Sequence, residues 1–135
     1  MAELHIKVLM PNIQKVDTVI DRVILPGIEG DFEVLDGHTP LITKLRSGIL
    51  KIYKNGKPDL YAIHDGFVTV ENNEILILSE NCENKNEISL DRATQAKERA
   101  EKRMSQMTSA ESEIDYRRAE IALKKALTRI EILHL

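Results

Sequence analysis

The chain has 135 residues, of which 42% are hydrophobic and 30% charged, so it is long enough to bury one domain core and too apolar to be disordered. Only 4% of the residues are aromatic and tryptophan is absent, which argues against the base-stacking platforms of single-stranded nucleic-acid readers. The formal net charge is −3, so the chain lacks the excess of positive charge that is typical of nucleic-acid-binding proteins, and we expect no nucleic-acid partner.

Residues 1–84 show the two-residue period of β-strands. Leu4, Ile6, Val8 and Met10 alternate with other side chains, and later apolar runs are broken by pairs of turn residues. The runs are Leu60–Ile63, Phe67–Val70 and Ile75–Leu78, and the turn pairs are Asn55-Gly56, Asp65-Gly66 and Asn72-Asn73. Such pairs are typical of hairpins. The pattern predicts an antiparallel β-sandwich over residues 1–84.

Glycine and proline are dense between Leu25 and Leu50. Glycine supplies positive φ angles and proline presets φ, so this segment is predicted to form a corner of the β structure, with Phe32, Val34 and Leu35 available for burial. His38 lies here without a cysteine, histidine or carboxylate at ligand spacing. The sequence therefore predicts no metal site.

These same residues carry a resemblance to a known family, the ε subunit of F-type ATP synthases. The matching pattern consists of Gly27, Gly30, Val34, Gly37, His38, Pro40 and Leu41, with Gly48 downstream. A later run, Asp65-Gly66-Phe67, resembles the family's Gly-Gly-Phe, and Asp65 replaces the first glycine. The family also has a helical tail, as is predicted here, so the resemblance covers nearly the whole chain. We expect the aspartate to alter one turn.

The resemblance implies a non-catalytic central-stalk, or rotor, subunit that takes part in ATP synthesis and in proton or sodium transport. Its implied partners are the γ subunit, the c-ring subunits and the catalytic head of α and β subunits. Glu29 and Asp31 would face the polar loops of the c ring, and the segment that includes His38 and Leu41 would lie against γ. The implied location is the cytoplasmic face of the bacterial inner membrane, peripherally, since no apolar run is long enough to span a bilayer.

Residues 85–135 change to a helical period and are predicted to form a two-helix hairpin. Ser89 is a suitable N-cap for the first helix, and Thr108 or Ser112 offers a start for the second. The apolar stripe consists largely of alanine and methionine, which bury little area. Such a hairpin is marginally stable, and we expect it to be mobile and regulatory.

The charge differs between the two parts. Residues 1–84 hold 8 basic and 13 acidic side chains, whereas residues 85–135 hold 11 basic and 9 acidic ones. The resemblance implies that the hairpin extends towards the catalytic head and inhibits ATP hydrolysis. The basic residues expected to make inhibitory contacts are Arg99, Lys102, Arg103, Arg117, Arg118, Lys124, Lys125 and Arg129.

Some family members also bind ATP in the folded hairpin. The positions that the resemblance assigns to such a site are Glu83, Ile88, Arg92, Arg99 and Arg129, and Asp91 is a further candidate two residues beyond the position of the family's aspartate. However, Ser89 stands where the family motif has an aspartate, and Lys125 replaces a usual arginine, whose planar fork binds phosphate oxygens more specifically. We expect no obligatory cofactor, and ATP, if it acts as a regulatory ligand, to bind weakly.

Two other functions stay open from the residues alone. An enzyme would have to use His38 with Asp36, or His64 with Asp65, but neither pair has a nucleophile or a phosphate loop beside it. An adaptor protein would use the β-sandwich as a platform and the helical tail to form a coiled coil. Co-purification with ATP synthase head subunits distinguishes the stalk subunit from both.

Overall fold

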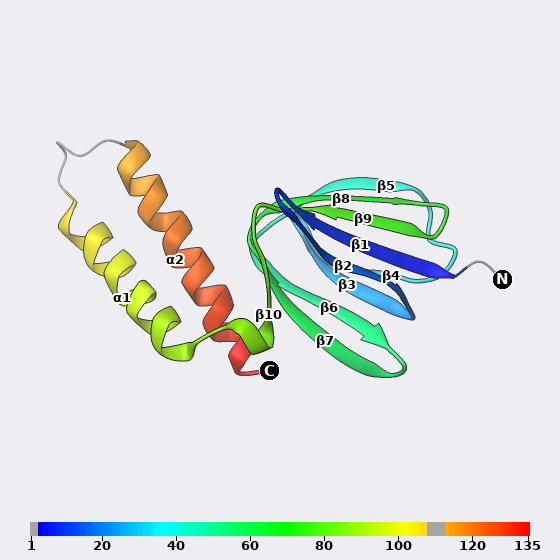
Figure 1. Ribbon diagram of the computed structural model, residues 1–135. Helices are drawn as coiled ribbons and strands as arrows, with labels where there is room; N and C mark the ends of the chain where they lie inside the picture. Colours follow the sequence, from blue (N-terminus) through cyan, green and yellow to red (C-terminus); the bar gives the residue numbers. More distant parts are fainter. Residues whose placement is uncertain (1–2, 108–112) are drawn as a thin grey trace. The chain divides into compact units, whose positions relative to one another are not determined.

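The structure is a computed structural model that describes residues 3–107 and 113–135. By its internal contacts the chain divides into two compact units, Met1–Asn84 and Lys85–Leu135, which are described separately below (Figure 1). The two starts predicted for the second helix, Thr108 and Ser112, lie outside the described residues.

The first unit is built from ten β-strands. They are β1 Leu4–Met10, β2 Ile13–Ile20, β3 Arg22–Gly27, β4 Gly30–Val34, β5 Leu41–Leu45, β6 Gly48–Lys54, β7 Lys57–Ile63, β8 Gly66–Glu71, β9 Glu74–Leu78 and β10 Cys82–Asn84. Their hydrogen-bonded order is β10-β7-β6-β3-β5-β8-β9-β1-β2, and β4 pairs with β3 outside this path. The pairing of β1 with β9 is parallel, and the other neighbouring pairs are antiparallel.

The sheet folds over on itself, so that β2 comes into contact with β6. The Asp21 N–H, between β2 and β3, donates to the Tyr53 carbonyl over 2.9 Å and extends the pairing of β3 with β6. Core side chains come from every strand, including Ile6, Leu50 and Ile77, which are fully buried. Because the core cluster runs only from Leu4 to Cys82, the sandwich closes its own core. The predicted fold class, a β-sandwich followed by two helices, is confirmed.

The predicted turns differ in what they connect. Asn55-Gly56 and Asn72-Asn73 join antiparallel neighbours, and all four residues have positive φ, as two-residue hairpin turns of this kind require. The prediction of a hairpin at Asp65-Gly66 was wrong, because β7 pairs with β6 and β10 whereas β8 pairs with β5 and β9. Among the residues expected in the core, Val34 is buried but Leu35 is exposed.

The second unit is a helical hairpin. A short 3-10 helix, η1 Lys85–Glu87, precedes α1 Leu90–Gln106 and α2 Glu113–Leu133, and the two long helices pack against each other. The predicted cap is confirmed, since the Ser89 hydroxyl accepts the Arg92 N–H. The Lys85 ammonium donates to the carbonyl of Leu135 over 2.7 Å, which ties the C-terminus to η1. Small residues dominate the buried positions of the long helices, among them Ala93, Ala100, Ala119 and Ala126.

Candidate functional site

One edge of the sandwich brings together the four residues that the resemblance places against the rotor. The turn between β3 and β4 and the start of β5 surround a hollow of about 400 Å³, and Glu29, Asp31, His38 and Leu41 all line it. Glu29 is exposed at the turn, whereas Leu41 is half-buried and packs against the core. The Nδ1 atom of His38 lies 2.6 Å from the carbonyl oxygen of Thr39.

Asp31 is held in place by an arginine. Arg46 Nη2 donates to Asp31 Oδ1 over 2.6 Å, and Arg46 Nη1 donates to the Gly27 carbonyl over 2.7 Å. The two bonds from one planar guanidinium fix the turn between β3 and β4 against the segment that follows β5. Because the Asp31 side chain is still 60% exposed, it remains accessible to a partner.

A second surface, which the sequence reasoning missed, lies on the outside of strands β1, β9, β8 and β5. The register aligns Leu9 with Leu78, and Leu78 with Phe67, across three adjacent strands. Side chains alternate along a strand, so this row faces away from the core. The outer apolar face consists of Leu9, Ile42, Phe67, Leu76 and Leu78. Ile42 is 78%, Phe67 56% and Leu78 48% exposed.

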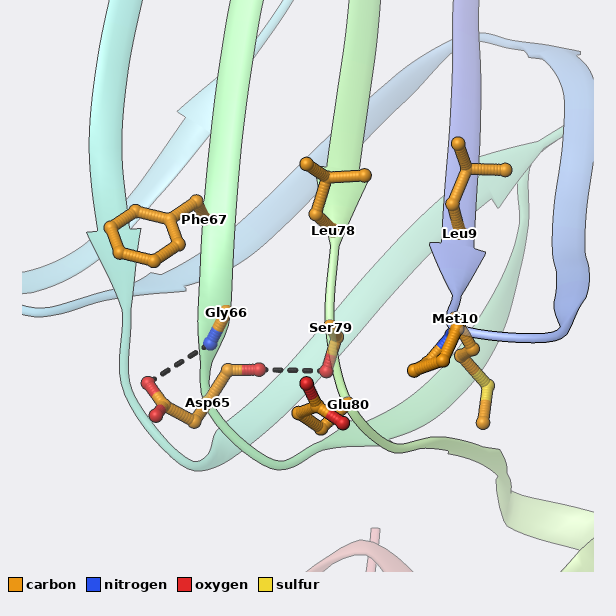
Figure 2. A pocket seen from close by; sticks show the side chains of 9 residues that line it. Leu9, Met10, Asp65, Gly66, Phe67, Leu78, Ser79 and Glu80 are labelled. Carbon is orange, nitrogen blue, oxygen red and sulfur yellow. Dashed lines mark hydrogen bonds between the residues drawn. The ribbon is translucent and has the colours of Figure 1, made fainter.

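The outer apolar face ends in a pocket of about 560 Å³. Figure 2 shows Phe67, Leu78 and Leu9 side by side above it, with Met10 at the β1 end. Asp65 and Glu80 lie along the opposite edge. The pocket is therefore apolar on most of its wall and acidic at one edge.

The hairpin has a hollow of its own, of about 590 Å³, between α1 and α2. Four of the basic residues predicted for inhibitory contacts line it, over a floor of alanines. They are Arg99, Lys102, Arg103 and Arg118. Arg117 lies elsewhere on α2, 3.7 Å from the carboxylate of Glu113, and Lys124 is exposed. Lys125 and Arg129 are partly buried. The structure thus gathers half of the predicted cationic set in one place.

The predicted nucleotide positions divide between the two units. Glu83 belongs to the sandwich, where His64 Nε2 lies 2.8 Å from its carboxylate. Asp91 and Arg92 are exposed in the first turn of α1, and the Ile88 N–H donates to the Lys85 carbonyl over 3.2 Å. The remaining positions, Arg99 and Arg129, lie on α1 and α2.

The residues of the alternative enzyme have other partners. His64 is buried and lies 3.3 Å from the Ser47 hydroxyl through Nδ1, while the Asp65 carboxylate accepts the Gly66 N–H over 3.0 Å. Asp36 accepts a hydrogen bond from the buried side chain of Asn73. Within residues 3–107 and 113–135, no three histidine, cysteine or carboxylate side chains are placed to hold a metal ion.

Comparison with known proteins covers both units. Residues 3–85 match the family model of the ATP synthase delta/epsilon chain beta-sandwich domain, and residues 86–133 match that of the long alpha-helix domain. The chain is 43% identical to the ATP synthase epsilon chain of Desulforamulus reducens over 83% of both chains. It is 36% identical to the epsilon chain of Halalkalibacterium halodurans over 98% of both, and 38% identical to that of Clostridium kluyveri over 98% of this chain and 99% of the relative.

Solved structures share the fold at lower identity. A chain of the Euglena gracilis mitochondrial ATP synthase superposes with a TM-score of 0.86 at 23% identity, covering 99% of this chain and 83% of the other. A chain from the central stalk and c ring of the Tetrahymena thermophila enzyme gives 0.70 at 13% identity, covering 98% and 97%. Within the described residues, neither long helix has the length and apolarity needed to cross a bilayer.

Proposed function

This chain belongs to the ATP synthase delta/epsilon chain family, and we propose that it is the non-catalytic epsilon-type subunit of a bacterial F-type ATP synthase, joining the γ subunit to the c ring in the central stalk. Its two parts have different tasks. The sandwich of residues 1–84 binds the rotor, and the hairpin of residues 85–135 is a mobile regulatory element that restrains ATP hydrolysis.

The outer apolar face is the observation that carries the docking proposal. Ile42, Phe67 and Leu78 project from one face of the sheet. Thr69 and Lys44 lie beside them, and a cluster of exposed apolar side chains of this kind marks a protein interface. Fully burying an exposed side chain of this size contributes about 1.5–3 kcal/mol, and Phe67 and Leu78, which are already about half-buried, would each contribute less than that. The γ subunit would cover this face with apolar side chains of its own.

The neighbouring hollow suits the polar loops of the c ring. Glu29 and Asp31 present carboxylates at the turn between β3 and β4, where Arg46 donates a hydrogen bond to Asp31. His38 and Leu41 line the same hollow nearer to β5, the strand that also carries Ile42. The sandwich therefore offers an apolar outer face to γ and, separately, carboxylates at the turn between β3 and β4 to the ring.

The hairpin supports a regulatory role through its composition and charge. Its buried positions are largely alanine, which gives little apolar area to hold the two helices together. A partner that binds the extended form therefore needs only a modest difference in affinity to shift the population. Arg99, Lys102, Arg103 and Arg118, which line the cationic hollow, are exposed, and in the extended form we expect them to meet acidic loops of the catalytic head.

ATP is proposed as a weak regulator at most. The cationic hollow is suited to phosphate oxygens, but Ser89 is used as the helix cap and supplies no carboxylate to the motif. Membrane association comes through the complex, at its cytoplasmic face.

A binding measurement tests the docking proposal. The chain carrying Ile42→Glu and Phe67→Glu should bind the γ-containing assembly of the source organism at least tenfold more weakly, because each substitution places a charge in an apolar interface. Both residues are exposed, so circular dichroism should show an unchanged fold. Ile114→Glu is the matched control, since Ile114 is 65% exposed but lies on α2. Equal affinities for all three proteins would contradict the proposal.

A further inference from the structure

The pocket at the end of the outer apolar face has a composition that selects one kind of side chain. Leu9, Phe67 and Leu78 supply apolar walls from three adjacent strands. Asp65 and Glu80 add two carboxylates along a single edge (Figure 2). A group that fills this pocket must therefore be apolar along most of its length and positively charged at its end.

Neither carboxylate is neutralised by a cation in the described part of the sandwich. Two other surface carboxylates of the sandwich do have arginine partners: Glu33 has Arg22 at 2.5 Å and Asp31 has Arg46 at 2.6 Å. Within the described residues of the sandwich, 3–84, no cation lies within ion-pair distance of Asp65 or Glu80. The charge at the edge of the pocket is thus available to a partner.

The backbone conformation of Asp65 helps to fix the position of its side chain. Its φ of 73° lies in the left-handed region, where glycine is unstrained and an aspartate is tolerated at a cost. The Ser79 hydroxyl donates to the Asp65 carbonyl over 2.7 Å, and the Asp65 carboxylate accepts the Gly66 N–H, so the residue is fixed in this conformation. The side chain is therefore pre-positioned at the pocket before any partner arrives.

We propose that this pocket receives one long basic side chain, arginine or lysine, from the γ-type subunit that docks on the outer apolar face. Its methylene stem packs along Phe67 and Leu78, and its charged end meets Asp65 and Glu80. The inference rests on the proposed function and adds to it the residue chemistry that selects the partner. A charged rim beside an apolar surface contributes mainly to specificity and to the rate of association.

Charge-neutral variants test the proposal with little change in shape. Asp65→Asn tolerates positive φ and keeps an oxygen acceptor for the Gly66 N–H, and Glu80→Gln removes the second charge. Glu3→Gln is the control, because it removes one exposed charge next to the other end of β1. The full chain and each variant are titrated against the γ-containing assembly of the source organism at 50 mM and at 500 mM salt, which are roughly the regimes of weak and strong screening.

The double variant should bind about fivefold more weakly at low salt, as expected for two partly exposed ion pairs, and the difference should nearly vanish at high salt. The Glu3→Gln control should match the original chain at both concentrations. If the original chain binds and the double variant binds equally well with the same salt dependence, this inference fails while the proposed function stands. If the original chain does not bind at all, the proposed function itself fails. Sedimentation of the chain alone adds a further check, because a dimer that the double variant dissociates would overturn the proposal in favour of a second copy as occupant.

Discussion

His5 lies between carboxylates from the two strands that flank β1. Its Nδ1 atom is 2.9 Å from Glu74 on β9, and its Nε2 atom is 2.5 Å from Asp17 on β2. The hydrogen bond to Glu74 is the main cause that raises the pKa of His5 above its ordinary value of 6.5; burial opposes it, and Asp17 adds to the increase. The protonated imidazole therefore links three strands at once.

This arrangement predicts a stability that depends on pH. Because the pKa of His5 is higher in the folded state, the stabilisation is fully present below pH 6.5 and is lost as the pH rises through the folded-state value. Both carboxylates are more than a third exposed, so the effect should be below about 1 kcal/mol.

Urea denaturation at several pH values measures this contribution to the free energy of unfolding. The His5→Gln variant should be less stable than the original chain at pH 5.5 and close to it at pH 9. A stability difference that stays constant across this range would show that the histidine acts by packing alone.

Ser89 determines how α1 begins. It has extended backbone angles, φ −98° and ψ 122°, and its hydroxyl accepts the Arg92 N–H over 3.3 Å. Ser89→Ala removes this acceptor and should cost about 1 kcal/mol of helix stability. Ser89→Asp keeps an oxygen acceptor and should stay within a few tenths of a kcal/mol of the original chain, since aspartate is an equally good cap.

The same pair of variants addresses nucleotide binding. The resemblance assigns an aspartate to position 89, so Ser89→Asp should raise the affinity for ATP relative to the original chain, whereas Ser89→Ala should not. Isothermal titration of both proteins with ATP provides the comparison. An unchanged affinity in Ser89→Asp would indicate that the cationic hollow, rather than the start of α1, limits binding.

At the scale of elements, the sequence predicts those strands and turns whose conformation depends on residues close together in the chain. The strands with strict alternation, such as Leu4–Met10, and the turns Asn55-Gly56 and Asn72-Asn73 follow from local periodicity and from the residues that tolerate positive φ. The strand Ile13–Ile20 was missed because its pattern is weak: Val16 and Ile20 are buried, but Ile13 is 55% exposed.

Local sequence patterns do not predict which strands that are distant in the sequence pair with each other. In the sequence, Leu9 and Leu78 look like ordinary strand residues. The structure shows that the parallel pairing of β1 with β9 places them side by side. The outer apolar face exists only because of that pairing and of the neighbouring β8. The resemblance identified Glu29, Asp31, His38 and Leu41, which the structure gathers around one hollow, but it did not reveal the adjoining surface.

At the scale of the whole molecule, the two units should separate cleanly. The core cluster lies entirely between Leu4 and Cys82, so a chain cut before Ile88 loses none of it. We expect residues 1–87 to fold and still to bind the γ-containing assembly. Circular dichroism and co-sedimentation measure the two properties. Failure of the truncated chain to fold would mean that the hairpin is a structural part of the sandwich, and failure to bind would assign rotor docking to the hairpin.

The central claim is that the sandwich docks while the hairpin restrains ATP hydrolysis. Hydrolysis is therefore compared in complexes that carry the intact chain, residues 1–87 alone, or a chain with four charges reversed. The reversed residues are Arg117→Glu, Arg118→Glu, Lys124→Glu and Lys125→Glu. A charge-conserving control carries Arg117→Lys, Arg118→Lys, Lys124→Arg and Lys125→Arg.

Restraint by the hairpin predicts that truncation raises the rate of ATP hydrolysis. The charge-reversed form should lie near the truncated one, because buried or partly buried contacts with acidic loops are each worth on the order of 1–3 kcal/mol. The charge-conserving control should remain near the intact chain. Equal rates from all four complexes, with each form shown to be bound, would contradict the claim and leave the hairpin without a part in hydrolysis.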